Sequence, residues 1–391
     1  MKIFYLMSSF EGGGASATLP DLLALIRERG HDVEVVACEA RDMKIAALVE
    51  KAGVPWSVLK GGTRGKPYKI FRLVAHLLRR RPDLIWTSHS KASFVGQVAG
   101  KILGIPVVSW KNQAASRPYS HRTRKVAKLW LADSDAVSAA LQRDLQVPQE
   151  RIMVWPLFEC AGHPLAGNMP GGHTPGKRRK GEPLRVGTLG RLHPLKQYDL
   201  LLHALAALRQ ARPGLAEQLH VHIGGDGPQE EELKALARSL GVEDLVTFEG
   251  FVTDTNAFLD TLDVYIQPSL KEGLCLGVHE ALSRGVPAIA TPAGNMGAIV
   301  KTGETGILLE STEGQACIDG CCKALAFFLD HPEQCAPLGQ EGRRRVLAQY
   351  GPGSFRRNGK KVMERIEGLV RRKARSSVRP SDSSPDASAH S

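Results

Sequence analysis

The segment LKEGLCLGVHEALSRGVPAIATPAGNMGAIV, residues 270–300, has the pattern of a loop, a helix and a buried strand. The strand candidate DVYIQ (263–267) precedes it, apolar residues recur at helical spacing over 276–284, and the short apolar run PAIA (287–290) follows. A strand, a crossover helix and a second strand in this order form a βαβ unit, whose two strands are parallel. The segment therefore predicts a parallel sheet covered by helices.

The same alternation extends from this segment in both directions. Strands are expected at 2–7, 32–37, 56–59, 84–87, 106–110, 129–132 and 151–155, and then at 184–189, 220–224, 245–250, 263–267, 287–290 and 306–310. Helices are expected at 18–29, 40–52, 68–80, 92–103, 135–145, 197–212, 229–240, 255–261, 276–284, 313–329, 332–349 and 353–373. This spacing predicts an α/β fold with two doubly wound, Rossmann-like domains that face each other across a cleft.

A segment rich in Gly, Pro and basic residues, CAGHPLAGNMPGGHTPGKRRKGEP (160–183), separates the two alternating halves and is typical of a linker. The final residues are rich in Ser and Pro and have no periodic apolar positions, which predicts disorder. The expected organisation is a domain at 1–160, a linker at 161–183, a domain at 184–352, a helix at 353–373 and a disordered tail at 374–391.

The positive charge of the chain is concentrated in one region. The net charge is +12 overall, yet residues 51–130 contain 17 Lys or Arg and a single acid, Asp83. A solvated helical face is the ordinary explanation, but so few acids favour an anionic partner, either a phosphorylated glycan or an acidic lipid surface. Nucleic acid ranks last, because no helix-turn-helix, zinc-finger or RNP-like pattern occurs, and we expect no nucleic-acid partner.

Composition excludes several other classes. No apolar run reaches the ~18–20 residues that span a bilayer, and the start, MKIFYLMSSF, is unlike a signal peptide. The seven cysteines are scattered, which indicates no disulfide framework. Cys317, Cys321 and Cys322 fall in an apolar helical pattern, where buried thiols are expected rather than metal ligands. We expect a cytoplasmic protein, with peripheral association at the inner face of the cytoplasmic membrane as an added expectation from the charge.

Two glutamates stand out in the segment 270–300. Glu272 lies in the loop before the helix, and Glu280 follows eight residues later within it. The free N–H groups at the start of such a helix form an anion site. A carboxylate beside that site would repel a phosphate, so Glu272 is better suited to accept hydrogen bonds from sugar hydroxyls, and Glu280 from a second polyol such as ribose.

At this point the sequence resembles a known family. Glu272 and Glu280 match the E-x7-E signature of the family 4 glycosyltransferases, which are retaining enzymes with the GT-B fold. The resemblance extends over about residues 1–372 and rests on further segments at 11–37, 186–205, 223–241, 248–254 and 267–273. It implies that the C-terminal helix returns to the N-terminal domain, that this domain binds the acceptor, and that the second domain binds a nucleotide-sugar donor.

The resemblance also implies roles for individual residues. In the family, the Arg and Lys of the G-R-L segment hold the nucleotide diphosphate, and here these are Arg191 and Lys196. Two cations stabilise a departing diphosphate as a metal would, and the donor half has no DxD motif at a strand end. The implied roles of Glu272 and Glu280 are contacts to the donor sugar and to the ribose. The remaining donor-binding residues that the resemblance implies are Gly13, Gly14, Gly190, Gly225, Gly273, Leu274, Cys275 and Leu276.

The acceptor half departs from the family pattern. Many members have a His after the strand that corresponds to 106–110, and Lys111 is expected near that place, where it would bind an acceptor phosphate or the leaving diphosphate. The other candidate is His89, which ends the preceding strand. Cys275 occupies the place of a usual Gly in the signature, which would make the pocket tighter.

These features predict a retaining, metal-independent hexosyltransferase that needs no cofactor beyond its UDP- or GDP-sugar substrate. The expected acceptor is an anionic glycan or a lipid-linked glycan, as in the synthesis of lipopolysaccharide core, exopolysaccharide or capsule. One alternative is a non-catalytic nucleotide-sugar-binding protein with the GT-B fold, and another is a different GT-B enzyme such as an epimerase. Release of nucleoside diphosphate distinguishes an enzyme from a binding protein.

Overall fold

The computed structural model describes residues 1–12, 18–61, 65–113, 118–160, 175 and 181–376. The predicted glycines Gly13 and Gly14, most of the predicted linker 161–183 and residues 377–391 of the predicted tail lie outside these described residues.

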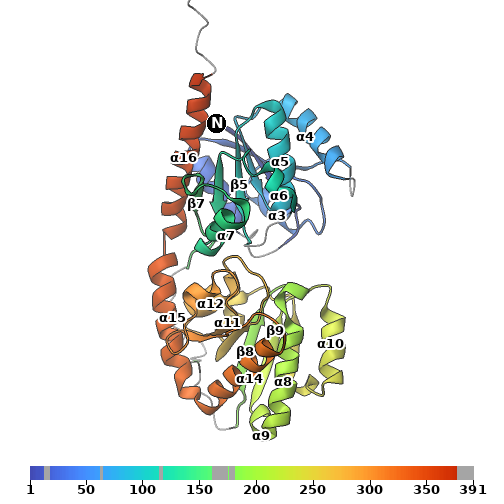
Figure 1. Ribbon diagram of the computed structural model, residues 1–391, viewed down its shortest axis with the longest axis vertical. Helices are drawn as coiled ribbons and strands as arrows, with labels where there is room; N and C mark the ends of the chain where they lie inside the picture. Colours follow the sequence, from blue (N-terminus) through green and yellow to red (C-terminus); the bar gives the residue numbers. More distant parts are fainter. Residues whose placement is uncertain (13–17, 62–64, 114–117, 161–174, 176–180, 377–391) are drawn as a thin grey trace, which may run out of the picture.

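Within the described residues, the first half forms a parallel sheet of seven strands in the order β3-β2-β1-β4-β5-β6-β7 (Figure 1). The strands are β1 (Lys2–Met7), β2 (Asp32–Ala37), β3 (Trp56–Val58), β4 (Leu84–Ser88), β5 (Val107–Lys111), β6 (Leu129–Ala132) and β7 (Ile152–Val154). The helices are α2 (Leu19–Glu28), α3 (Lys44–Lys51), α4 (Lys66–Arg80), α5 (Ser90–Leu103), α6 (Pro118–Thr123) and α7 (Asp135–Leu145). Both faces of the sheet are covered, which explains why its strands are nearly continuous apolar runs.

The described part of the second half forms a parallel sheet of six strands in the order β10-β9-β8-β11-β12-β13. The strands are β8 (Leu184–Leu189), β9 (Leu219–Gly224), β10 (Val246–Gly250), β11 (Val264–Gln267), β12 (Ala288–Ala290) and β13 (Gly306–Leu308). The helices are α8 (Tyr198–Ala211), α9 (Pro213–Ala216), α10 (Glu230–Ser239), α11 (Thr255–Leu259), α12 (Leu276–Ser283), α13 (Met296–Ile299), α14 (Gly314–Asp330) and α15 (Cys335–Tyr350). The predicted doubly wound α/β fold with two sheets is thus confirmed.

The last helix, α16 (Ser354–Ser376), returns to the first half and runs along it (Figure 1). Its Val362, Met363 and Ile366 are buried in the core of the first half. The ring of Trp155 packs against that of Phe355 at 5.0 Å between centroids with a tilt of 36°, and its indole N–H donates to the Phe355 carbonyl. Buried apolar and aromatic surface therefore joins the end of the chain to its beginning.

Two details of the predicted elements are wrong. The tail was expected from 374, but α16 continues to Ser376, because no Pro or Gly interrupts its polar end. The short helices α6, α9 and α13 were not expected, since four to six residues are too few to show helical periodicity. Cys317 and Cys321 are buried in the core of the second half, as expected from their pattern, whereas Cys322, which was also expected to be buried, is only partly buried against that core.

The strand orders determine where a ligand can bind. In the first sheet β1 lies between β2 and β4, and in the second β8 lies between β9 and β11. From the central strand of each sheet, the chain first adds strands on one side and later on the other. The helical connections on the two sides diverge at this point, which opens a crevice beyond the carboxyl ends of the central strands. The loops that follow β1, β4, β8 and β11 are placed to form a site between the halves.

Candidate functional site

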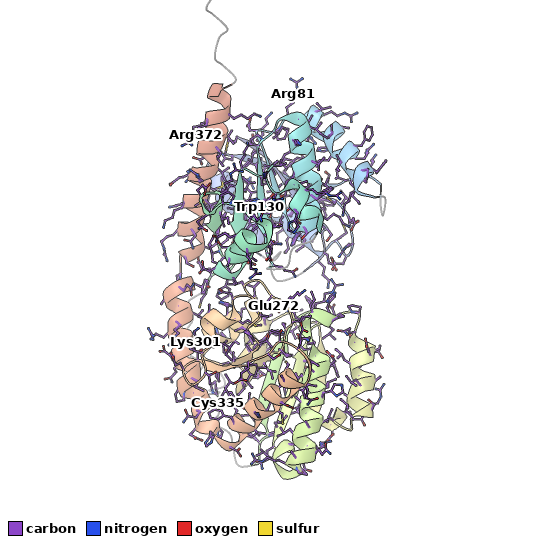
Figure 2. All side chains as sticks on the ribbon, in the orientation of Figure 1. Arg81, Trp130, Glu272, Lys301, Cys335 and Arg372 are labelled. Atoms are coloured by element: carbon purple, nitrogen blue, oxygen red, sulfur yellow. The ribbon has the colours of Figure 1, made fainter. Side chains whose placement is uncertain are left out.

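The two halves enclose a cleft of about 1750 Å³. Figure 2 places Glu272 at the level where the two halves meet. The cleft is lined by the predicted site residues that the structure describes: Arg191, Lys196, Glu272, Glu280, Gly190, Gly225, Gly273, Leu274, Cys275, Leu276, Lys111 and His89. Residues as distant in the sequence as His89 and Glu280 thus share one cavity.

Glu272 is held by a chain of hydrogen bonds that begins inside the second sheet. The Tyr265 hydroxyl donates to Gln267 Oε1 at 3.0 Å, and Gln267 Nε2 donates to Ser269 Oγ at 2.9 Å. Ser269 Oγ in turn donates to Glu272 Oε1 at 2.7 Å. Lys196 Nζ donates to the same carboxylate oxygen at 2.6 Å. Residues at and after the end of β11 therefore hold the Glu272 carboxylate in place, and Lys196, in the segment after β8, forms an ion pair with it.

Lys196 is charged in this arrangement. Burial by itself would lower the pKa of Lys196, but the Glu272 carboxylate outweighs that effect, and the pKa is raised overall. The aliphatic part of the side chain crosses the backbone of Gly190, where a Cβ would lie 3.1 Å from Lys196 Cε. A Cβ on Gly225 would lie 2.0 Å from the Gly190 carbonyl oxygen. Gly190 and Gly225 thus leave room for the loop that positions the cation.

Arg191 follows β8 and reaches across the cleft to Glu11, which follows β1 in the other half. Arg41 pairs with the second oxygen of the same carboxylate. Burial acts to raise the pKa of Glu11, but the two guanidinium groups lower it by more than burial raises it. The pKa is therefore lowered overall, and the carboxylate is ionised. About half of the Arg191 side chain, 52%, remains exposed, so the guanidinium is accessible to a ligand in the cleft.

Glu280 lies on α12 and lines the cleft about two turns into the helix. Burial raises the pKa of its carboxyl group. Among the described residues, no side chain forms a hydrogen bond or an ion pair with it that would neutralise this charge. Its environment differs from that of Glu272, which is paired with a cation.

The segment between these glutamates packs closely on both halves. A Cβ on Gly273 would lie 1.9 Å from the Asn112 carbonyl oxygen and 2.9 Å from Asp133 Oδ2, both in the first half. On the other side, the Asn295 N–H donates to the Gly273 carbonyl at 2.8 Å. Only a residue without a side chain fits between these two walls. Gly273 is therefore a point of contact between the halves as well as a residue of the donor loop.

Cys275 precedes α12 with a left-handed backbone, φ 64°, that side-chain-bearing residues adopt at a cost of about 1–2 kcal/mol. The thiol is buried, and burial raises its pKa, so the sulfur is protonated. The conformation explains why Gly is favoured at this place in the family pattern, and a protonated thiol here fills space without adding charge.

The two acceptor-side candidates also line the cleft. His89 precedes α5 with φ 70°, and burial lowers the pKa of its imidazole. Lys111 is 8% exposed, and burial lowers its pKa to about 8, although Asp144 and Asp133 act in the opposite direction. Lys111 thus lies within the electrostatic influence of two acidic residues of its own half, and the backbone carbonyl of the next residue, Asn112, meets the donor loop at Gly273.

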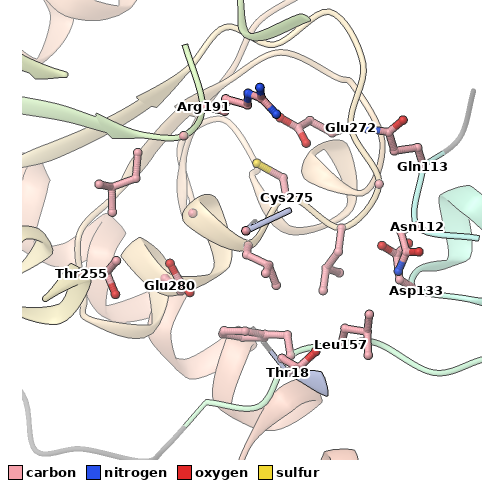
Figure 3. Close-up of a pocket in the computed structure, with 18 of the residues that line it drawn as sticks. Thr18, Asn112, Gln113, Asp133, Leu157, Arg191, Thr255, Glu272, Cys275 and Glu280 are labelled. Atoms are coloured by element: carbon pink, nitrogen blue, oxygen red, sulfur yellow. The ribbon is translucent and has the colours of Figure 1, made fainter. Parts of the chain in front are cut away.

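Sequence reasoning missed three residues of the site: Glu11, Asn112 and Asp133. Figure 3 shows Asn112 and Asp133 together at the wall that faces the loop of Glu272. Asp133 is 4% exposed, and burial raises the pKa of its carboxyl group well above the usual range, with the Glu272 charge adding to the effect. Asp133 follows directly after a predicted strand, and this position was the available signal for it.

Three side-chain atoms at this wall, Asn112 Oδ1, Asn112 Nδ2 and Asp133 Oδ1, are buried and have no hydrogen-bonding partner among the described residues. A buried polar atom without a partner costs about 1–3 kcal/mol. Such atoms at a cleft wall mark a place where a ligand group would be accommodated.

Two family models match the chain. The one described as Glycosyltransferase Family 4 matches residues 12–158, and the one described as Glycosyl transferases group 1 matches residues 174–345. Together they cover both halves. The described residues contain no cluster of three or more His, Cys, Asp or Glu that could hold a metal ion, and no described helix is long and apolar enough to cross a membrane.

Curated relatives match over different lengths. A D-inositol 3-phosphate glycosyltransferase of Actinosynnema mirum is 30% identical over 355 residues, which is 76% of this chain and 80% of the relative. A putative glycosyltransferase EpsD of Bacillus subtilis is 32% identical over 152 residues, which is 39% of this chain and 38% of that protein. Several such matches span less than two thirds of the relative's own length.

Among solved structures, HepE of Anabaena in complex with UDP and glucose has a TM-score of 0.74 at 21% identity, with 94% of this chain and all of that chain covered. This likeness shows the fold alone. With both family models matched and the Actinosynnema relative aligned over most of its length, the chain belongs to the family 4 glycosyltransferases, with the GT-B fold.

Proposed function

We propose that this protein transfers a hexose from a nucleotide-diphosphate sugar to a glycan or glycolipid acceptor with retention of configuration. The observation that carries the proposal is the convergence of Arg191, Lys196 and Glu272 at the switch point of the second sheet. Two cations and a sugar-facing carboxylate at one crevice suit a ligand that has a diphosphate at one end and hydroxyls at the other.

The diphosphate would take over the ion pairs that the cations now make. Lys196 is paired with Glu272, and Arg191 with Glu11. When a diphosphate enters, both cations gain a partner with more negative charge, and Glu272 is released to accept hydrogen bonds from the sugar. Charge that develops on the leaving diphosphate is then stabilised by groups already in place, so the proposed reaction is independent of a metal.

Retention is proposed to occur by front-face displacement. The acceptor hydroxyl attacks the anomeric carbon from the side on which the diphosphate leaves, and a phosphate oxygen of the leaving group takes the hydroxyl proton. The new glycosidic bond forms as the bond to the diphosphate breaks. The protein contributes positioning and electrostatic stabilisation.

Glu280 is proposed to hold the ribose of the donor. Its side chain is partly buried and has no hydrogen-bonding partner among the described residues, so it is suited to accept from the two ribose hydroxyls. The complex of HepE with UDP and glucose supports a uridine nucleotide as the first donor to test.

An anionic acceptor at a membrane surface is proposed from the first half. Helices α4, α5 and α6 pack side by side and fall within residues 51–130, where 17 basic residues occur with one acid. We call the outer side of these three helices the basic face. Helix α4 also exposes Phe71 (67%) and Leu78 (58%), and α5 exposes Ile102 (61%). Exposed apolar side chains among Arg and Lys are typical of binding to anionic lipid.

The relative from Actinosynnema is named for a phosphorylated acceptor, which agrees with an anionic acceptor for this chain. A lipid-linked or polysaccharide acceptor of the bacterial envelope would present both the charge and the membrane. A non-catalytic nucleotide-sugar-binding protein is the second candidate, favoured by Cys275 in a position that suits Gly.

The proposal is tested by incubating the protein with UDP-glucose or GDP-mannose and membrane extracts, and by measuring nucleoside diphosphate release together with the anomeric configuration of the product by NMR. Release with an axial product is expected from an axial donor. Binding of donor without any release contradicts the enzyme and supports the binding protein, and an inverted product contradicts retention.

A further inference from the structure

We propose that the buried hydroxyl of Tyr265 is a positioning group that fixes the three donor-binding segments of the second half relative to one another. These segments are the loop after β8, the loop after β11 and helix α12. Each contributes a charged side chain to the cleft, Arg191, Glu272 and Glu280 respectively (Figure 3). The inference rests on the proposed function, because that function gives each segment a different part of the donor to hold.

The first observation is that Tyr265 bridges the two central strands where they diverge. The pairing of β8 with β11 ends at Gly187 and Tyr265. Beyond this point, the Leu189 N–H donates to the Tyr265 hydroxyl at 3.0 Å, and the Leu189 carbonyl oxygen lies 3.1 Å from the same hydroxyl. The hydroxyl thus takes the place of a neighbouring strand for the last residue of β8, which leads directly into Gly190 and Arg191.

The second observation is that the same hydroxyl begins the hydrogen-bond chain to Glu272. Its single proton is shared between the Leu189 carbonyl and Gln267 Oε1, which lies 3.0 Å away. Gln267 donates to Ser269, and Ser269 donates to the Glu272 carboxylate. Burial raises the pKa of Tyr265 well above its usual range, so the hydroxyl keeps its proton and both donates and accepts. One oxygen atom therefore links the end of β8 to Glu272.

The third observation is the close approach of helix α12. Gly277 lies in its first turn, and a Cβ at this position would lie 2.2 Å from the Tyr265 hydroxyl oxygen. A residue without a side chain lets the helix rest directly on the hydroxyl. Glu280 follows three residues later on the same helix. The distance of the helix from the sheet at this contact therefore also determines where the Glu280 carboxylate lies.

The Tyr265 oxygen thus contacts, directly or through two side chains, all three segments. Its loss leaves the Leu189 N–H without its partner and opens a gap below α12, so the segments can shift independently. Such shifts affect catalysis more than binding, because the charge on the leaving diphosphate develops only in the transition state.

The test is Tyr265→Phe, which removes only this oxygen. For nucleoside diphosphate release from UDP-glucose, kcat per UDP-binding site should fall about tenfold, while KM and the Kd for UDP should rise only about threefold. Isothermal titration with UDP counts the sites, since a loss of folded protein changes their number and not kcat per site. Tyr5→Phe, which removes a buried hydroxyl that contacts Ser88 in the first half, is the matched control and should keep all three constants. If the wild type uses GDP-mannose instead, GDP replaces UDP.

A second pair of variants tests the contact with α12. Gly277→Ala should lower kcat at least about tenfold, because its methyl group meets the Tyr265 oxygen. Adding Tyr265→Phe should raise kcat again to about that of Tyr265→Phe alone, because the next nearest atoms to the Cβ lie 3.1 Å and 3.4 Å away. Gly368→Ala, with no atom within 4 Å of its Cβ, is the control and should change kcat in neither background.

An unchanged kcat per site in Tyr265→Phe overturns the positioning role, and so does a Gly277→Ala/Tyr265→Phe variant whose loss is the product of the two single losses. A wild type that binds UDP or GDP without release contradicts the proposed transfer. The Kd then decides the role of Tyr265: a threefold rise in Tyr265→Phe supports it, and an unchanged Kd overturns it. A wild type that binds neither nucleotide contradicts the proposed function and this role together.

Discussion

The ammonium group of Lys196 lies 2.6 Å from Oε1 of Glu272, so the cation expected at the diphosphate is paired with the carboxylate expected at the sugar. Both side chains are more than three-quarters buried, which strengthens their attraction. The pair keeps each group in place and compensates its charge before a donor arrives. A donor would supply a new partner for each of the two side chains, a diphosphate for Lys196 and a sugar hydroxyl for Glu272.

The first prediction concerns Lys196. Lys196→Ala should lower kcat/KM for nucleoside diphosphate release by about 10²–10³-fold, because the leaving group loses a preorganised cation. Lys234→Ala, which removes a partly buried lysine on α10 that pairs with Glu230 and does not line the cleft, is the control and should behave as wild type. A loss below threefold in a folded Lys196→Ala protein would show that Lys196 does not contact the leaving group.

The second prediction concerns contact between the halves. Gly273→Ala places a methyl group 1.9 Å from the Asn112 carbonyl oxygen, so the halves must move apart or the loop must shift. Transfer should fall about a hundredfold, since a misplacement of about 1 Å is enough for such a loss. Gly214→Ala, with no atom within 4 Å of its Cβ, should retain full activity. Equal rates for the two variants would contradict a tight contact at Gly273.

The third prediction concerns pH and His279. Its ring is fully buried, Nδ1 lies 3.0 Å from the Cys275 carbonyl, and burial lowers its pKa to about 4. The unfolded chain takes up this proton below about pH 6.5 and the folded chain does not, so stability falls as the pH drops from 6.5 toward 4. Between pH 7 and 4.5 this residue should account for about 2 kcal/mol of lost unfolding free energy.

Urea unfolding of His279→Gln at the two pH values measures this term. The variant should lose about 2 kcal/mol less than wild type over that interval. His203→Gln, which removes an exposed imidazole, should lose as much as wild type. An identical pH dependence in His279→Gln and wild type would mean that His279 is protonated in the folded protein.

The fourth prediction concerns the basic face. Arg79→Glu/Arg81→Glu should weaken binding to phosphatidylglycerol vesicles at least about tenfold, because each charge near an anionic surface contributes about 1 kcal/mol. Arg81 lies at the far end of the first half from Glu272, so affinity for UDP should not change (Figure 2). Arg238→Glu/Lys323→Glu, on the second half, is the matched control. Equal vesicle binding by both double variants would show that the basic residues of the first half form an ordinary solvated surface and not a lipid-binding one.

Much of the fold could be predicted from the sequence, because βαβ units have a local signature. The runs at 2–7, 32–37 and 184–189 are strands with the expected bounds, since buried parallel strands are short apolar segments between amphipathic helices. Helices α6, α9 and α13 could not be predicted, because their few residues are held by tertiary packing rather than by periodicity.

The candidate site divides in the same way. Glu272, in the loop after β11, and Glu280, in the helix that follows, lie in one continuous segment. Their spacing in the sequence therefore indicated a site. The pairing of Glu11 with Arg191 depends on the association of the two halves, which no local pattern encodes. Asp133 follows directly after a predicted strand, so its position could have indicated it.

Lys111 and His89 were the candidates at the strand ends of the first half, and Asn112 was not predicted. Asn112 meets Gly273 through its backbone carbonyl, and such a contact leaves no side-chain signal in the sequence.

The roles of Arg191 and Lys196 are tested most directly by nucleoside diphosphate release from UDP-glucose or GDP-mannose in the presence of EDTA, measured for wild type and for the folded double variant Arg191→Ala/Lys196→Ala. Wild type should keep its rate in EDTA, because the two side chains stabilise the leaving diphosphate, and the double variant should lose nearly all activity. Near-wild-type release by the double variant, or loss of wild-type release in EDTA, would show that these two cations do not stabilise the leaving group.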